Sequence, residues 1–225
     1  MRILGRRKIK DEYKIKVVKA VRKLQPGDIV IYHGTSFPSW AIRTFTGDEK
    51  THTSLYLGCG KFGEAIYYHF LPLKKWGAIE NNPSDYSFRH CKKIEIYRPK
   101  TSEENKQKAI KYAKKHTGNT NCYDSLNTIR YGIKKILDTK KSRHFRKLNE
   151  FLNPLKSDID NALGTRLEQT ERKNKFYCSN LAIEAYKRNG FDILENVEVD
   201  NTRMILPKDI VKSERLERIG EFSFT

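Results

Sequence analysis

Cysteine, histidine and glutamate together can make a thiol attack a carbonyl carbon, and the chain offers such a set in Cys178, His52 and Glu64. A cysteine is a nucleophile only as a thiolate, so it needs a base that takes its proton and a polar group that orients this base. Each residue also has a structural interpretation: Cys178 as a small buried apolar side chain, His52 as a packed core histidine and Glu64 as a solvated strand residue. Whether the catalytic or the structural interpretation holds depends on whether the helices and strands that carry these residues bring the three side chains together.

Cys178 stands at the start of a predicted amphipathic helix that ends near Gly190. The apolar positions recur at helical spacing and form one stripe: Leu181, Ala182, Ala185 and Tyr186. The start of a helix presents unpaired N–H groups and the positive end of the helix dipole, which stabilise an anion such as a thiolate. The sequence therefore predicts a nucleophilic cysteine in the first turn of a core-packed helix.

His52 and Glu64 fall on two predicted strands of one hairpin. The runs HTSLYLG and KFGEAIYYHF are joined by Gly58-Cys59-Gly60, which is a strong hairpin signal. Across such a hairpin, Glu64 should lie opposite or diagonal to His52. We expect His52 to act as the base and Glu64 to orient its ring.

An earlier strand, residues 28–33, follows a Pro26-Gly27 turn and carries Tyr32 and His33. These two side chains could supplement an oxyanion site, although for His33 we favour a structural or surface position. The loop after this strand, residues 34–50, contains an aromatic patch that could line a core or a groove.

The remaining patterns complete an α+β chain. In CKKIEIYRPK, apolar and polar residues alternate, which predicts a half-buried strand. Ser102 is a predicted N-cap of a helix that ends at Gly118. Residues 123–137 repeat apolar side chains at helical spacing and predict a second helix. Residues 138–175 are polar and charged, with a short helix after Asn153-Pro154, and read as an insertion or lid. MILPKDI and RIGEFSF predict one or two final strands. We divide the chain into a basic arm, residues 1–23, and one domain, residues 24–225, that includes the insertion.

Five stretches, in this order, carry a family resemblance: QPGDIVIYHG, THTSLYLGCGKFGEA, IEIYRPK, AIKYAKKHTGNTNCYDSL and FYCSNLAIEAYKRNG. The chain resembles the circularly permuted branch of the NlpC-type papain-like cysteine hydrolases, above all the YiiX-like group, which is distantly related to lecithin:retinol acyltransferase. The resemblance covers most of residues 24–211. It implies a permuted papain-like fold, with an antiparallel sheet or partial barrel packed against helices and the nucleophile last, at a helix N-terminus.

Carried over by position, the resemblance implies that Cys178 is the nucleophile, His52 the base and Glu64 the orienting residue. Tyr123 and Asp124 match a Tyr-Asp pair whose role we take to be structural. The chain departs from the family by lacking the signal peptide of exported relatives, by having CSNL where CSEL is common, and by its basic arm and polar insertion. The missing signal peptide puts a peptidoglycan substrate in doubt. CSNL removes a charge beside the nucleophile, and the arm or the insertion could redirect substrate choice.

The chain is strongly basic, with a net charge of +18 over 225 residues. Its first 24 residues hold ten Lys/Arg against Asp11 and Glu12, so this arm could bind nucleic acid or an anionic membrane, or could be a solvated helix. No apolar run is long enough for a membrane span or a signal peptide, which predicts a cytoplasmic protein, peripheral to a membrane if the arm binds one.

We expect no cofactor and no metal. The four cysteines lie far apart without a CxxC pair, which favours reduced thiols. A metal site at His90-Cys91 with His69 or Cys122 lacks the spacing of metal ligands. Trp40 and Trp76 are predicted to line the core or a groove, as large aromatic side chains usually do.

Two functions remain open. The first is a cysteine hydrolase, either a peptidase or amidase or a lipid acyl hydrolase or acyltransferase, that works through a thioester acyl-enzyme. The alternative is a basic module that binds nucleic acid or anionic membrane and carries an inactive papain-like site. No RNA-binding, helix-turn-helix or zinc-finger signature accompanies the basic residues.

Overall fold

The computed structural model describes residues 2–67, 76–82, 90–118, 178–198 and 205–224. Within these ranges the centre of the molecule is a six-stranded sheet in the order β4-β3-β2-β1-β5-β6, in which every neighbouring pair is antiparallel. The strands are β1 (Ile29–Gly34), β2 (His52–Gly58), β3 (Lys61–Tyr67), β4 (Trp76–Asn81), β5 (Cys91–Pro99) and β6 (Leu216–Ser223). The predicted α+β class, with an antiparallel sheet packed against helices, is confirmed.

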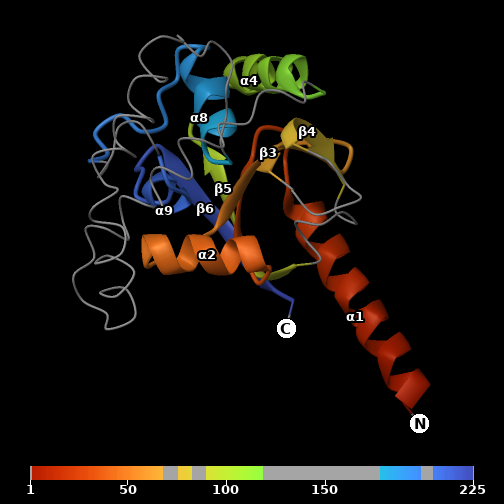
Figure 1. The fold of residues 1–225 in the computed structure, drawn as a ribbon. Helices are drawn as coiled ribbons and strands as arrows, with labels where there is room; N and C mark the ends of the chain where they lie inside the picture. The colour runs from red at the N-terminus through yellow and green to blue at the C-terminus, as the bar shows by residue number, and fades with distance from the viewer. Residues whose placement is uncertain (1, 68–75, 83–89, 119–177, 199–204, 225) are drawn as a thin grey trace, which may run out of the picture.

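Helices surround this sheet, as Figure 1 shows. They are α1 (Arg2–Lys23), α2 (Phe37–Thr46), α4 (Glu103–His116), α8 (Asn180–Lys187) and α9 (Pro207–Ile210). α4 and α8 pack against each other and against β2, and α8 also contacts β3. α1 leads from the N-terminus towards the sheet, and most of its length stands clear of the other elements in the view of Figure 1.

β1 is buried on both faces because it lies between two apolar clusters. Ile29 and Ile31 belong to the cluster formed with α4 and α8, whereas Val30 and Tyr32 belong to the cluster that includes the end of α1. Successive side chains of a strand point to opposite faces, so an uninterrupted apolar run fits a strand with helices on both sides. β1 is therefore the element on which both halves of the core are built.

Local sequence signals account for the elements that were predicted correctly. Ser102 caps α4 by accepting a hydrogen bond from the Asn105 backbone N–H, with two glutamates in the first turn and a basic last turn. Between β2 and β3, Gly58, Cys59 and Gly60 all have positive φ, which is the backbone that a tight hairpin requires.

Two predicted elements were wrong. Residues 37–46, read as a loop, form α2, which Ser36 caps at its start and Gly47 ends in the left-handed conformation at φ 68°. The segment MILPKDI, read as a strand, contains the short helix α9, because Pro207 at its first position favours a helix start. The strand β4 was not predicted. Trp40 on α2 is 53% exposed, so it is not a core residue.

Several predictions lie outside the described residues, namely the helix at 123–137, the Tyr123-Asp124 pair, the polar insertion at 138–175 and the cysteine at 122. The division into an arm and one domain stays a prediction. No helix in the described ranges is both long and apolar enough to cross a membrane.

Candidate active site

The β2-β3 hairpin brings His52 and Glu64 together. In the register of this hairpin, Ser54 lies opposite Glu64, so His52, two residues earlier on the same face, is diagonal to the glutamate. His52 Nε2 lies 3.3 Å from Glu64 Oε2. The side chain of His52 is 17% exposed and that of Glu64 is 1% exposed. The carboxylate is thus buried behind an imidazole that remains partly accessible.

Cys178 reaches the same place from the opposite end of the sequence. It lies in a turn just before Ser179, the N-cap of α8, so it stands two residues before the helix rather than in its first turn. Its thiol is half-buried, and interaction with it helps to raise the pKa of the His52 imidazole. The His52 ring therefore interacts with both the thiol of Cys178 and the carboxylate of Glu64.

Two contacts hold the start and the body of α8 in place. The Ser179 hydroxyl donates a hydrogen bond to the Ile205 carbonyl and does not cap the helix. The Tyr186 hydroxyl donates to the Gly27 carbonyl at 2.6 Å, which joins α8 to the turn before β1. The helix that follows Cys178 is thereby attached to the sheet that carries His52.

Glu64 is held directly by Asn81 and Tyr32 and indirectly by Ser54, and of these only Tyr32 was assigned to the site from the sequence. Asn81 Nδ2 donates to Glu64 Oε2 at 3.0 Å, and the Tyr32 hydroxyl donates to Oε1 at 3.4 Å. Ser54 and Tyr32 share a hydrogen bond of 2.8 Å between their hydroxyl oxygens. Ser54 could have been found from its place two residues after His52 on one strand face. Asn81 could not, because it lies on β4.

Tyr32, which was predicted as an oxyanion or pocket residue, joins this group. Its ring centroid lies 5.4 Å from that of His52, and its hydroxyl faces Ser54 and Glu64. Burial raises the pKa of Tyr32 well above 10, and the nearby charge of Glu64 adds to the shift. The hydroxyl therefore stays protonated and acts as a donor to the carboxylate.

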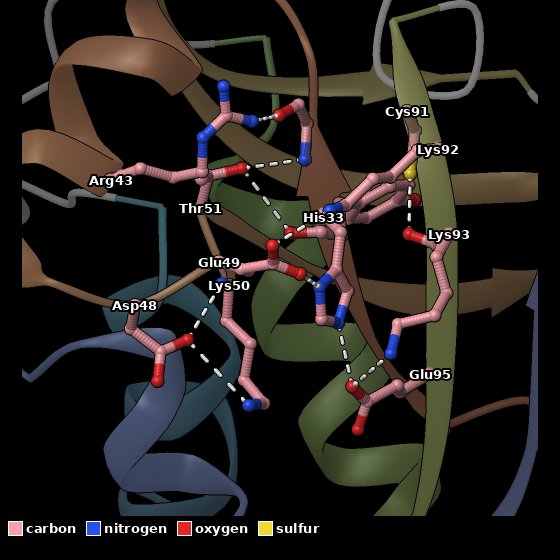
Figure 2. A network of polar contacts seen from close by, with 12 residues as sticks. His33, Arg43, Asp48, Glu49, Lys50, Thr51, Cys91, Lys92, Lys93 and Glu95 are labelled. Carbon is pink, nitrogen blue, oxygen red and sulfur yellow. Dashed lines mark hydrogen bonds and ion pairs between the residues drawn. The ribbon is translucent and has the colours of Figure 1, made fainter.

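His33 belongs to a different network, which Figure 2 shows. Its Nε2 lies 2.6 Å from Glu95 Oε1 and its Nδ1 lies 3.7 Å from Glu49 Oε2. Hydrogen bonding to His33 lowers the pKa of Glu95 to about 2. Consecutive residues of a strand face opposite sides, so His33 and Tyr32 point apart. The predicted oxyanion role of His33 gains no support from this position.

The protonation of His52 is controlled by its surroundings. Burial of the ring lowers the pKa of His52, but hydrogen bonds to Cys178 and Glu64, together with the negative charge of both partners, raise it more. The result is a pKa of about 10, compared with an ordinary value of 6.5. At neutral pH the ring is therefore an imidazolium, which is the form that pairs with a thiolate.

The other described cysteines have different environments. Cys59 is exposed at the tip of the β2-β3 hairpin. Cys91 is buried, its Sγ donates to the Lys93 carbonyl at 2.6 Å, and burial raises the pKa of its thiol to about 11. Of the thiols in the described ranges, Cys178 is the one whose interaction shifts the pKa of a histidine side chain.

Comparison with known proteins supports the fold. No protein-family model matches the chain, and no curated protein matches it. Among solved structures, the chain is similar to the metalloprotein YiiX from Escherichia coli O157:H7, described under DUF1105, with a TM-score of 0.50 and 16% sequence identity. The similarity covers 88% of this chain and 97% of YiiX. The fold is therefore YiiX-like.

YiiX is described as a metalloprotein. In the part of this chain that the structure describes, no three His, Cys, Asp or Glu side chains are grouped so that they could hold a metal ion. The His52 imidazole interacts with Cys178 and with Glu64, and the three side chains are not arranged as ligands around one metal position.

Proposed function

We propose that this protein is a cysteine hydrolase or acyltransferase of the permuted papain-like type, with Cys178 as nucleophile, His52 as base and Glu64 as orienting residue. One observation carries the proposal: the His52 imidazole interacts with the Cys178 thiol on one side and with the buried Glu64 carboxylate on the other. This is the arrangement that activates a thiol and holds the base in one orientation. The order of the three residues along the chain, with Cys178 last, is the one that the resemblance to the permuted branch implies.

The first half of the reaction forms a thioester. In the resting site the thiol proton already lies on the His52 imidazolium, and the thiolate of Cys178 attacks the carbonyl carbon of an amide or ester. The tetrahedral intermediate then breaks its bond to the amine or alcohol, which leaves with the proton from the His52 imidazolium. The acyl group remains on the sulfur. Because Glu64 contacts Nε2, Nδ1 is the ring nitrogen left for the thiol and the leaving group.

Charge develops on the carbonyl oxygen during this step. The start of α8 offers stabilisation, since Ser179 uses its hydroxyl on the Ile205 carbonyl and leaves the first backbone N–H groups without a side-chain cap. In the second half of the reaction, His52 deprotonates a water molecule, which attacks the thioester and releases a carboxylic acid. An acceptor amine or alcohol in place of water would make the same site an acyltransferase.

Alkylation by iodoacetamide at pH 7, followed by peptide mapping, tests the proposal. An ordinary thiol is about 3% ionised at this pH, so a thiolate held by an imidazolium should react roughly tenfold faster. We expect Cys178 to be labelled first, with exposed Cys59 as the internal control for access. His52→Ala should slow labelling at Cys178 and leave the rate at Cys59 unchanged.

Equal labelling rates at Cys178 and Cys59, unaffected by His52→Ala, would contradict the proposal and favour a binding module with an inactive site. A second measurement is hydrolysis of p-nitrophenyl acyl esters and of peptide and lipid amide libraries by the full chain. Cys178→Ser should abolish turnover, while Cys59→Ser should retain it. The preferred library would identify the acyl donor.

A further inference from the structure

We propose that α1 is a docking element for an anionic membrane surface. This inference does not depend on the proposed catalytic function. The inward face of α1 packs on the core, and its outward face carries exposed apolar and basic side chains.

The inward face of α1 fixes how the helix is turned. Val17, Ala20 and Leu24 are buried in the cluster formed with β1, β2, β3 and β5. The ring of Tyr13 lies against Phe224, with centroids 5.6 Å apart. These positions follow one another at spacings of three and four along one face. The opposite face of α1 is therefore directed away from the protein.

The outward face carries apolar side chains where solvent would disfavour them. Ile15 is 54% exposed and Val18 is 48% exposed, and with Trp40 they are the large apolar side chains exposed in the described ranges. Ile15 and Val18 are three residues apart, so they form one short ridge on the helix. No element of the described structure covers this ridge.

Cations flank the ridge on both sides. The exposed basic residues around it are Lys14, Lys19, Arg22 and Lys23. The helix sequence as a whole holds ten Lys/Arg against Asp11 and Glu12. Basic side chains are attracted to the anionic lipids of a membrane surface, and β-branched apolar side chains between them can enter the boundary of headgroups and acyl chains. Both properties meet on the face of α1 that the described residues leave exposed.

The same charges would attract nucleic acid, but the rest of the face argues against it. Binding to nucleic acid needs phosphate contacts and gains from aromatic rings that stack on bases. Tyr13 is the aromatic residue of α1, and it packs inward against Phe224. The outward ridge consists of Ile15 and Val18 instead, and these aliphatic side chains can pack against the acyl chains of lipids. A membrane is thus the partner that uses all of the exposed face.

The position of α1 suits this role. In Figure 1 the helix runs from its junction with the sheet towards the N-terminus, apart from α4 and α8. Docking through α1 would therefore hold the protein at a lipid surface without covering the helix that follows Cys178.

Sedimentation of the full chain with vesicles tests the inference. The vesicles are phosphatidylcholine alone or with 30% phosphatidylserine, in low and high NaCl. We expect binding to the anionic vesicles that is lost in high salt, and little binding to phosphatidylcholine alone. Lys14→Gln with Lys19→Gln should weaken binding roughly thirtyfold, since each basic residue near the surface contributes roughly fivefold. Ile15→Ser with Val18→Ser should weaken it as well, at unchanged net charge.

The control removes the same charge elsewhere, by Lys111→Gln with Lys115→Gln, two exposed positions of α4. This variant should bind almost as the unchanged chain does. The inference is overturned if the chain does not bind anionic vesicles, or if the α4 variant loses as much binding as the α1 charge variant. It is also overturned if the apolar variant binds unchanged while a short RNA or DNA duplex competes with the vesicles. Circular dichroism checks that each variant is folded.

Discussion

The charge of His52 is the single-residue property that the fold changes most clearly at the candidate site. Its pKa of about 10 means that the folded chain keeps a proton that the unfolded chain releases near pH 6.5. The stabilisation from this proton is complete below pH 6.5 and is lost as pH rises towards 10. We therefore expect the urea midpoint to fall between pH 6.5 and 10, and to fall less in His52→Gln. Parallel decreases in both proteins would show that His52 does not cause the effect.

Asn81 is the residue whose removal best tests how Glu64 is held. Its amide donates to a carboxylate that is almost fully buried, so Asn81→Ala leaves that oxygen with one donor fewer. We expect the free energy of unfolding to drop by about 1–3 kcal/mol. If Glu64 orients His52, alkylation of Cys178 should slow as well. Asn81→Asp is the sharper comparison, because it places a second carboxylate beside Glu64 and should destabilise the chain further.

The Pro26-Gly27 turn is the local element on which the docking of α8 depends. Gly27 has φ +94°, and a Cβ there would lie 2.7 Å from the Tyr186 hydroxyl oxygen and 3.0 Å from Lys106 Cβ. The same hydroxyl donates to the Gly27 carbonyl. Gly27→Ala should therefore lower the free energy of unfolding by roughly 2–5 kcal/mol, from backbone strain and the clash together.

Gly60 supplies the matched control for this element. It also has positive φ, at +73°, but nothing lies within 4 Å of its added Cβ. Gly60→Ala should cost only the left-handed backbone, about 1–2 kcal/mol. Urea unfolding of both variants separates the two contributions. Equal losses of unfolding free energy in the two variants would mean that the close approach of Tyr186 to Gly27 does not contribute to stability.

Over the whole molecule, Asp28 joins three parts of the chain. Its buried carboxylate accepts hydrogen bonds from Arg98 Nε and Nη2 at 2.9 and 2.8 Å and from the Gln25 backbone N–H at 2.8 Å. Arg98 Nη2 also donates to the Lys23 carbonyl at the end of α1, at 3.4 Å. The aspartate thus connects the end of α1, the start of β1 and the end of β5.

Asp28→Asn should lower the free energy of unfolding by about 2–3 kcal/mol, because the hydrogen bonds to a charged group become weaker and Arg98 loses its partner. Glu104→Gln removes a carboxylate from an exposed pair with Lys108 on α4 and should leave stability almost unchanged. Thermal melting of both variants at low and high salt provides the comparison. An equal effect of the two changes would contradict the role of Asp28.

Much of the fold could be predicted because its signals are local. The Gly58-Gly60 turn, the Ser102 cap and the apolar stripe after Cys178 each lie within a few residues of the element that they define. α2 was missed even though Ser36, Pro38 and Gly47 are a cap, a first-turn proline and a helix end. The aromatic residues of that segment fit a groove wall as well as a helix, so its composition alone distinguishes neither.

By itself the sequence determined which residue types were present for thiol chemistry, most of the strands, and the helix behind the cysteine. Only the tertiary structure decided which carboxylate each histidine meets. His33 and His52 both stand on neighbouring strands, but one pairs with Glu95 and the other with Glu64. It also brought Asn81 to the carboxylate from β4. The physical reason is that such meetings depend on strand register, on the face to which each side chain points and on the closure of long loops. None of these is encoded in a local pattern.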